Sequence, residues 1–445
     1  AGFRPASSRT LNTRLLFPEK QDAGYGELVR DRKGILDLPR NFRYKVISHA
    51  GEKMADGYFV PGLFDGMGTF SGPKGTTILL RNHEFRVGTS PSLGPFRGER
   101  RLEERLDRDL VYDFDKKGRP CLGGVTTLVF STKEQRLETQ FLSLVGTLTN
   151  CSGGTTPWGT WISCEESVES VAEGFGKNHG FAFEVPVSAE PGVHPPKPLT
   201  ALGRFVHEGV AVVPETGIVY QTEDRENSLF YRFLPDTPGD LAAGGHLQAL
   251  SIVDQPGLNT RNWKIRKVSE GERWSVRWID LAPVLDEKDE LRYVGVRRGA
   301  GVFARGEGIA YLNGEIYFGC TIGGRNMKGQ IWRYTPSPYE GTPRENEELA
   351  TLELMLEPND QELMDCPDQF SVTPWGDLLA CEDGEGDQYV LGISPGGDVY
   401  RFARNARDQS ELAGVCFSPD GSTLFVNNMA AGLTFAITGP WKSFS

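Results

Sequence analysis

The chain carries one segment twice, at widely separated positions in its 445 residues. The first copy, TPWGTWISCEE, runs from Thr156 to Glu166, and the second, TPWGDLLACED, runs from Thr373 to Asp383. Each copy enters an apolar stretch through a Pro-Trp-Gly turn and leaves it through a cysteine and two acids. A self-match of this kind indicates a repeat architecture, so we expect several copies of one unit.

The repeated unit contains two recognisable strand patterns. The first is an apolar strand that ends in polar residues, at 76–84, 160–166, 217–224, 314–321, 376–383 and 422–429. The second is a strand of aromatic and β-branched residues, at 123–131, 178–186, 227–235, 328–336, 396–404 and 431–439. Another short strand precedes the first pattern, as at 209–214, 308–313 and 414–419. Gly, Pro, Asp and Asn mark the joins, as hairpin turns require.

These units predict an all-β six-bladed β-propeller, with three clear strands and a less distinct fourth in about 70 residues per blade. The propeller is expected to cover 41–445 as a single domain, after an irregular lead-in over 1–40. The last unit has no room for an outer strand, so the strand at 41–48 is predicted to pair with 431–439 and close the ring. The stretches 86–120 and 248–298 are interpreted as insertions that leave the blades. Two β-sandwiches are the rival fold.

Composition narrows the classes of partner. The formal net charge of −12 argues against nucleic-acid binding and suits a protein whose carboxylates hold cations. No apolar run reaches the roughly 18 residues that a membrane span needs. No signal segment is visible, and the polar start is interpreted as a processed or trimmed one. The cysteines number seven, so at least one is unpaired in any disulfide scheme.

A propeller would gather polar residues at one mouth of its central channel. The innermost strand of a blade starts on the face where its antiparallel neighbour ends, so residues at these two points converge. The residues at the starts are Asp65, Cys151, His207, Glu208, Arg305, Glu307, Asp368 and Leu412. The residues at the ends are His83, Glu84, Glu165, Glu166, Glu223, Asp224, Cys320, Glu382, Asp383, Asn427 and Asn428. So many close carboxylates need cations in order to ionise together, which predicts metal binding.

The donor types indicate which metals fit. Carboxylate and amide oxygens favour Ca²⁺, and a thiolate among them favours a softer or more acidic metal such as iron. Cys151 is the candidate thiolate, because its glycine-rich loop lets the backbone approach a ligand closely. Cys164 and Cys381 hold equivalent strand positions and are expected to pack between blades. Any single acid could instead be a solvated residue at a strand end, and Arg305 could simply pair with Glu307.

Seven motifs resemble the PhoX-type alkaline phosphatases. They are NHE at 82–84, NCSGGTTPWGTWISCEE at 150–166, RFVHEGVAV at 204–212, YQTEDR at 220–225, RGEGIAY at 305–311, CTIGG at 320–324 and CEDGEG at 381–386. The resemblance spans most of the chain. It implies a six-bladed propeller, export to the periplasm or the extracellular space, and hydrolysis of phosphate monoesters on a mixed Fe(III)–Ca²⁺ centre.

The resemblance also implies roles for individual residues. The family's iron-bridging cysteine falls on Cys151, and its phosphate-contacting arginine falls on Arg305. Its metal-binding glutamates fall on Glu208 and Glu307. The chain departs from the family in Ser152, where alanine is expected, and in its shorter peripheral loops, which bear on substrate range.

The segment CEE at 164–166 supplies one more metal ligand in this interpretation. Glu165 is preferred to Glu166, because Glu165 aligns with Glu223 and with Glu382 in the internal repeat, and Glu382 is taken as a ligand as well. The further candidates, as ligands or as residues that support ligands, are Glu84, Glu166, His207, Glu223, Asp383 and Asn427.

The sequence therefore predicts a metal-dependent phosphatase, monomeric, acting on small phosphate esters at the channel mouth. One alternative is a calcium-dependent lactonase or phosphotriesterase-like hydrolase, which has no need of the Cys151 thiol. The other is a non-enzymatic binding platform, which has no need of acids at both the strand starts and the strand ends. The fold alone decides none of these three functions. Elemental analysis of the protein separates them, because the phosphatase should hold iron and calcium, the alternative hydrolase calcium alone, and the binding platform no metal.

Overall fold

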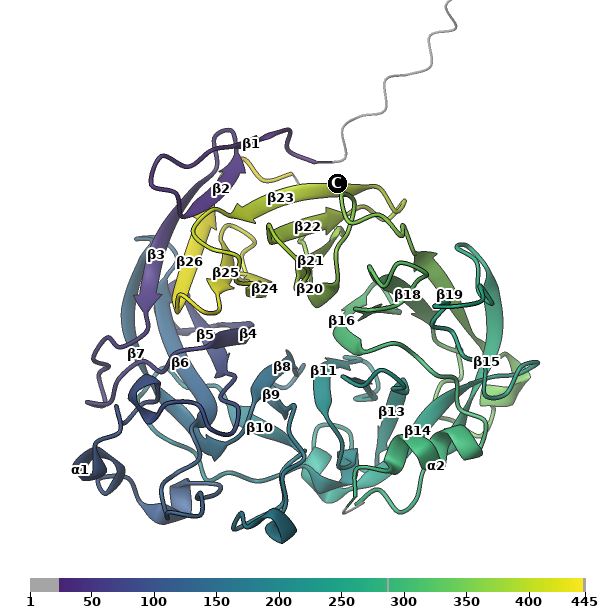
Figure 1. Cartoon of the computed structure of the whole chain (residues 1–445), viewed down its shortest axis with the longest axis horizontal. Coiled ribbons are helices and arrows are strands. Elements are labelled where there is room, and N and C mark those ends of the chain that lie inside the picture. Colours follow the sequence, from purple (N-terminus) through teal and green to yellow (C-terminus); the bar gives the residue numbers. More distant parts are fainter. Residues whose placement is uncertain (1–23, 286–287, 443–445) are drawn as a thin grey trace, which may run out of the picture.

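The computed structural model describes residues 24–285 and 288–442, which form β-sheets arranged in a ring (Figure 1). Six strands of this described part line the centre of the ring: β4 (Phe64–Ser71), β8 (Asn150–Thr155), β11 (His207–Val212), β16 (Gly306–Leu312), β20 (Pro367–Val372) and β24 (Leu412–Phe417). Each contacts the next, and β24 contacts β4, so the ring is closed.

From each inner strand the chain runs outward through antiparallel hairpins. The second strands are β5 (Thr76–His83), β9 (Thr160–Glu165), β12 (Val219–Glu223), β17 (Glu315–Cys320), β21 (Leu378–Glu382) and β25 (Leu424–Asn428). The third strands are β6 (Gly123–Ser131), β10 (Ala182–Pro186), β13 (Tyr231–Pro235), β18 (Gln330–Thr335), β22 (Tyr389–Ile393) and β26 (Leu433–Thr438). The outer strands are β7 (Arg136–Thr147), β14 (Gly245–Ile252), β19 (Ala350–Leu356) and β23 (Val399–Asn405).

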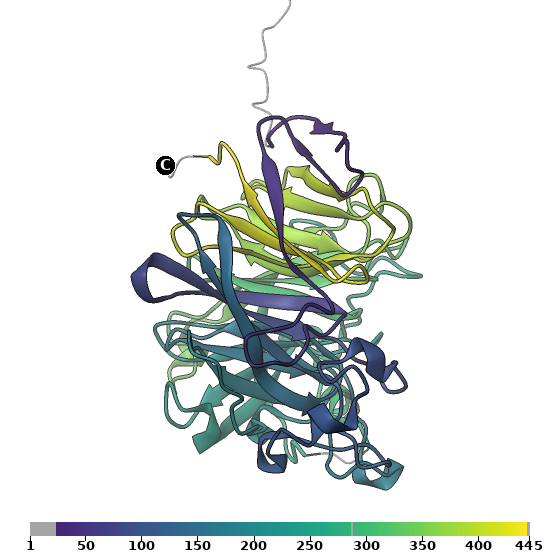
Figure 2. The same cartoon turned by 90° about the vertical axis from the view of Figure 1, so that its left-hand side faces the viewer.

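The two ends of the propeller meet in one sheet. Strand β3 (Arg43–His49) pairs antiparallel with β26, from Thr438 opposite Arg43 to Leu433 opposite His49. Figure 2 shows this N-terminal strand, in purple, lying against the yellow C-terminal strands. The predicted closure is confirmed, and it removes an unpaired sheet edge that would otherwise favour aggregation.

The prediction of six separate blades needs refinement. Hydrogen bonding joins the strands of the described residues into five sheets, because β15 (Arg273–Asp280) pairs with both β14 and β19 and merges two strand sets into one nine-stranded sheet. The set that begins with β8 has three strands. The fold is therefore all-β and propeller-like, and the two-sandwich alternative does not describe its closed ring.

The segments expected to be irregular or inserted contain regular structure. Strands β1 (Leu28–Val29) and β2 (Leu36–Pro39) extend the sheet beyond β23, where Leu36 and Leu38 are buried. Residues 1–23 of the expected lead-in lie outside the described residues. The 86–120 insertion carries helix α1 (Arg100–Glu103), whereas 248–298 begins within β14 and includes β15 and helix α2 (Leu291–Arg297). No helix in the described part is long and apolar enough to cross a bilayer.

Five of the cysteines lie in strands, whereas Cys121 and Cys366 lie in the segments just before β6 and β20. All seven fall within the described residues, and all are free. Cys164 and Cys381 are at most 1% exposed and pack in apolar clusters that join neighbouring strand sets, as predicted.

Candidate metal centre

Every inner strand carries an irregularity at the same point near its start. In β8, Asn150 lies opposite Glu165 and Gly153 opposite Ser163, so β8 has one residue more than β9 over this interval. The same shift occurs in the other five inner strands. Such a bulge bends the strand and re-aims a side chain. The first residues within these intervals are Asp65, Cys151, Glu208, Glu307, Asp368 and Gly414.

Five of these bulge residues can donate to a metal, and four of them belong to overlapping donor groups. The ligand atoms lie within 4.8 Å of one another in each group, and the groups are Cys151–Glu166–Glu208, Glu208–Glu307–Asp368 and Asp368–Asp383–Glu411. Because Glu208 and Asp368 are each shared by two groups, the three form one continuous row, which we call the donor row. It contains one thiol and six carboxylates.

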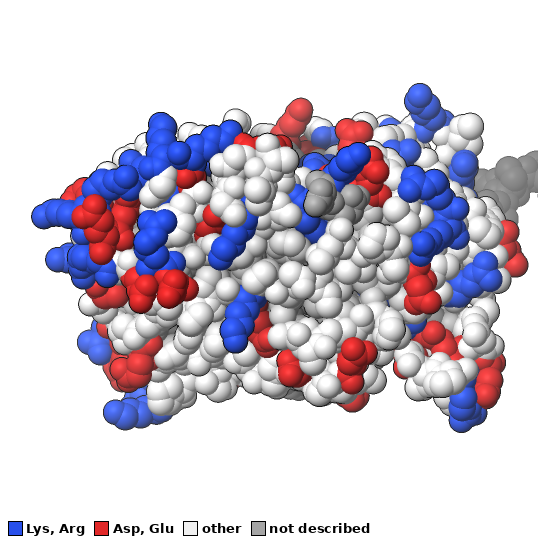
Figure 3. Space-filling view, turned by 90° about the horizontal axis from the view of Figure 1, so that it is seen from below, with Lys and Arg blue, Asp and Glu red and all other residues white. Residues whose placement is uncertain are grey.

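Cys151, Glu208 and Glu307 of the donor row are buried, Glu166, Asp368 and Glu411 are partly buried, and Asp383 is exposed. Burial raises the pKa of Glu166, Glu208 and Glu307 well above ordinary values, and nearby carboxylates raise it further, as Asp368 does for Glu208. Burial raises the pKa of the Cys151 thiol, and the negative charge of Glu208 raises it further. By contrast, acids and bases are interspersed on the outer face of the ring drawn in Figure 3. Cations bound to the row would allow its members to ionise together.

Cys151 is held in place through its backbone. The side-chain amide of Asn82 donates to the carbonyl oxygens of Cys151 and Ser152, at 3.1 and 2.7 Å. A Cβ atom on Gly66 of the neighbouring strand would lie 2.8 Å from the Cys151 carbonyl oxygen, so glycine permits this close approach. Asn82 is in turn held by the indole N–H of Trp161 at 2.9 Å.

Arg305 lies at the edge of the donor row. Its Nη2 donates to Glu307 Oε1 at 3.0 Å, and Nε and Nη2 donate to the two oxygens of Asp224 at 2.5 and 2.9 Å. Arg305 lies just before β16 with a φ of 53°, and its side chain pairs with that of Glu307, as one interpretation of the sequence allowed. The side chain is 32% exposed, which leaves it accessible to a small ligand.

Comparison with protein families shows which family this chain belongs to. The family model "Alkaline phosphatase PhoX" matches residues 23–139 and 126–432, which is most of the chain. The chain belongs to the PhoX family of alkaline phosphatases. Among curated proteins no significant match was found.

Solved structures agree with the PhoX assignment at the level of fold. Pseudomonas fluorescens PhoX in complex with vanadate, a transition state analogue, has 18% identity and a TM-score of 0.64, over 91% of this chain and 96% of that chain. Two weaker likenesses are a Xanthomonas campestris gluconolactonase, with 10% identity and a TM-score of 0.38 over 94% and 99% of the two chains, and a luciferin-regenerating enzyme, with 11% identity and 0.42 over 91% and 97%.

In this PhoX-family chain the donor row contains the second acid of the CEE segment and not the first. Glu166 belongs to it, whereas Glu165 is turned away and fully used by other groups. Glu165 Oε1 accepts the N–H of Leu148 at 3.0 Å and faces His179 Nδ1 at 2.6 Å, and Oε2 accepts the N–H of Gly180 at 2.9 Å. The preference for Glu165 is therefore not supported by the structure, because successive strand residues point to opposite sides.

The other two repeats show the same offset. Glu382 Oε1 accepts the N–H of Asp365 at 2.6 Å, while Asp383 joins the donor row. Glu223 Oε2 accepts the Tyr231 hydroxyl at 2.7 Å, while the following residue, Asp224, binds Arg305. In all three repeats the residue just after the second strand joins the donor row or binds Arg305 at its edge.

The remaining candidates surround the row. Glu84 is 5% exposed and accepts from Arg86 Nε at 2.9 Å, and it lies close enough to Glu166 for the two to interact. Asn427 donates to the Asp65 carbonyl at 2.7 Å. His207 is turned away, with Nε2 3.1 Å from the Gly203 carbonyl oxygen.

The structure adds one donor that the sequence did not indicate, Glu411, and two that were placed at the mouth without being assigned as ligands, Asp65 and Asp368. Asp368 and Glu411 belong to the row, and Asp65 is buried beside it, where its Oδ1 accepts from the Gln369 amide. Asp65 and Asp368 stand in the slot shared by Cys151, a signal that the repeat already contained. Glu411 precedes its strand by one residue, and no pattern in the sequence marks it.

Proposed function

We propose that the chain is a metal-dependent phosphatase that hydrolyses phosphate monoesters at the donor row. The observation that carries this proposal is the row itself, one thiol and six carboxylates joined through Glu208 and Asp368, with Arg305 at its edge. We count the fold as six blades joined by β15, with the row at one mouth of their channel.

The residues fit a mixed iron and calcium centre. Cys151, Glu166 and Glu208 supply one sulfur and two oxygens, which suits iron, whereas Glu307, Asp368, Asp383 and Glu411 supply the oxygens that Ca²⁺ prefers. Within the described part of the chain, Arg305 is the one cation that forms a salt bridge with a carboxylate of the row, through Glu307, so one positive charge faces six acids. Such a centre neutralises phosphoryl oxygens and activates an oxygen nucleophile.

Arg305 would bind the substrate phosphate. Its planar fork matches two phosphoryl oxygens, and Asp224 and Glu307 hold the guanidinium at the edge of the row. Burial lowers the pKa of Arg305, but Glu307 and Asp224 outweigh burial and hold it above its ordinary value, so the charge persists in alkaline solution.

Measuring the metals and the activity on the same preparation tests this proposal. We expect iron and calcium by elemental analysis, hydrolysis of a simple aryl phosphate, and inhibition by vanadate, which binds P. fluorescens PhoX. Calcium alone, with lactone or phosphotriester hydrolysis, would favour the alternative hydrolase. A protein with neither metal nor activity would be a binding platform. We also propose that the enzyme is exported and monomeric.

A further inference from the structure

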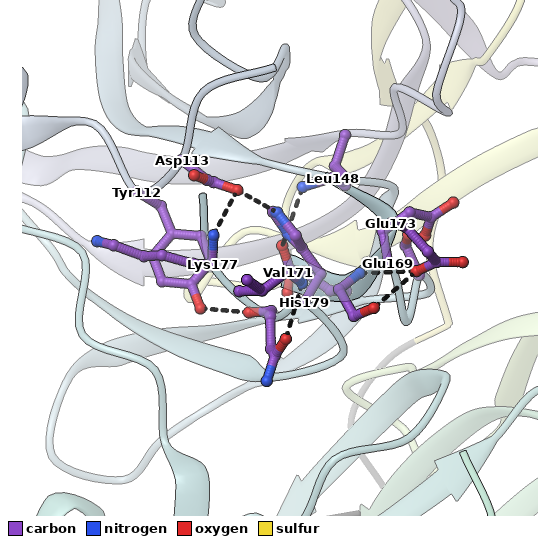
Figure 4. Close-up of polar contacts among 12 residues, drawn as sticks. Tyr112, Asp113, Leu148, Glu169, Val171, Glu173, Lys177 and His179 are labelled. Carbon is purple, nitrogen blue, oxygen red and sulfur yellow. Dashed lines mark hydrogen bonds and ion pairs between the residues drawn. The ribbon is translucent and has the colours of Figure 1, made fainter. Parts of the chain in front are cut away.

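A second set of donors lies away from the donor row, where the 86–120 insertion meets the loop between β9 and β10. Asp113, Cys121 and His179 each offer one ligand atom, and these atoms lie within 4.8 Å of one another. Their exposed fractions are 2%, 4% and 0%. Figure 4 shows the carboxylate of Asp113 meeting the imidazole of His179 and the backbone N–H of Lys177, at 3.2 and 3.0 Å.

Backbone contacts hold these ligands in place before any ion arrives. Phe114 and Pro120 form an isolated bridge, and the Cys121 N–H donates to the Asp113 carbonyl at 3.0 Å. Asp113 and Cys121 are therefore opposite each other across a short hairpin. The backbone of His179 is held from both sides, because its N–H donates to Glu169 and its carbonyl accepts from Arg204 Nε at 2.7 Å.

Glu165 determines which ring nitrogen of His179 faces the other two donors. Its Oε1 lies 2.6 Å from Nδ1, and its two oxygens also accept backbone N–H groups of Leu148 and Gly180. A carboxylate in this position favours the tautomer with the proton on Nδ1, which leaves the Nε2 lone pair facing Asp113 and Cys121. A nitrogen lone pair, a carboxylate oxygen and a sulfur then converge, and they repel unless a cation or a proton lies among them.

We propose that Asp113, Cys121 and His179 bind a divalent transition-metal ion, with zinc favoured by the donor set, and that Glu165 positions His179 for it. Zinc takes nitrogen, sulfur and oxygen ligands at about 2.0–2.3 Å, which sets ligand atoms roughly 3.3–3.7 Å apart in a tetrahedron. The 3.2 Å between His179 Nε2 and Asp113 Oδ2 is close to that separation. Water or the second Asp113 oxygen would complete the shell.

This ion would tie the insertion to the end of β9, one residue before Glu166 of the donor row. A proton is its competitor. Burial lowers the pKa of His179, but Glu165 and Asp113 outweigh burial and raise it to about 12, so an imidazolium could link the two carboxylates. The experiment must therefore distinguish a metal ion from a proton.

The test starts from the Cys151→Ala protein, in which the thiol of the donor row is gone. We expect it to retain about one zinc per chain after growth with zinc, and to show sulfur in the metal shell by X-ray absorption. Zinc-free protein, or zinc bound without sulfur, would overturn the proposal whether or not further variants fold.

Single substitutions then locate the ion. Cys121→Ala and His179→Gln should lose this zinc while iron and calcium stay at wild-type levels, because neither residue belongs to the donor row. Cys416→Ala removes a buried thiol elsewhere and should keep the zinc. Zinc retained in a folded Cys121→Ala protein would also overturn the assignment.

Discussion

Arg305 and Asp224 form a two-point contact at the edge of the donor row. Arg305 Nε lies 2.5 Å from Oδ1 and Nη2 lies 2.9 Å from Oδ2, while Nη2 also donates to Glu307. Asp224 follows the second strand of its set and Arg305 precedes the first strand of the next, so the contact joins neighbouring sets. It fixes the plane of the guanidinium that we propose for phosphate binding.

Replacement of Arg305 by lysine tests this role. We expect kcat/KM on an aryl phosphate to fall about 10²-fold, with kcat affected, because a lysine ammonium cannot contact two phosphoryl oxygens in a fixed plane. Metal content should stay unchanged. Arg225→Lys is the control, since Arg225 pairs with Asp289 instead and should leave the kinetics intact. Wild-type kinetics in Arg305→Lys would reduce the arginine to a partner of Glu307.

The two acids of the CEE segment should behave differently. Glu166→Gln is expected to lose iron and most activity with its stability preserved, because it removes one charge from the donor row. Glu165→Gln should lower the free energy of unfolding by about 1–3 kcal/mol, since an amide N–H would meet the N–H donors that now point at the carboxylate. Metal analysis and urea unfolding of both variants check this, and the reverse pattern would restore Glu165 as the ligand.

The thiols give a matched pair as well. Cys151→Ala is expected to lose iron and most phosphatase activity, because Cys151 is the sulfur of the donor row. Cys164→Ala removes a buried thiol from an apolar cluster and should cost about 1 kcal/mol of stability while keeping iron. Normal iron content in Cys151→Ala would make that thiol structural.

Removal of metal should abolish the activity. After exhaustive dialysis against a strong calcium chelator we expect no hydrolysis of an aryl phosphate, and added Ca²⁺ should restore at least part of it. The midpoint of calcium binding should weaken in acid, because carboxylates must release protons in order to bind. Full activity in the chelated protein would contradict the proposed centre.

His207 should make stability depend on pH. Burial lowers its pKa to about 4, and its ring stacks on Phe205 at 3.7 Å. An unfolded histidine has a pKa of about 6.5, so the unfolded chain binds a proton that the folded chain refuses between these values. The free energy of unfolding should therefore fall as pH drops from about 6.5 to 4, by up to about 3 kcal/mol, and this contribution should level off below pH 4.

Urea unfolding of metal-free protein at pH 7 and pH 5 measures this dependence without interference from bound ions. His207→Gln cannot titrate, so its stability should change less between the two pH values than that of the wild type. Equal changes in the two proteins would show that His207 contributes nothing to this pH dependence and would contradict the prediction.

The sequence by itself determined the repeated unit, the all-β ring and the pairing of the N-terminal strand with β26. These follow from patterns that each segment carries locally, namely strand alternation, turn residues and a last unit without an outer strand. The slots that gather acids at one mouth follow too, because antiparallel alternation places every strand start and end. The glycine-rich loop around Cys151 marked this residue as the candidate thiolate ligand.

Only the tertiary structure decided which acid of each pair lies at the donor row. Glu165 and Glu166 are both acidic and both repeat, and a shift of one residue exchanges the two faces of a strand. Contacts between distant segments decide three further features. They let β15 merge two strand sets, they bring Glu411 to the donor row, and they bring Asp113 and Cys121 next to His179. Local patterns specify that a strand forms, whereas its neighbours in space decide where each side chain points.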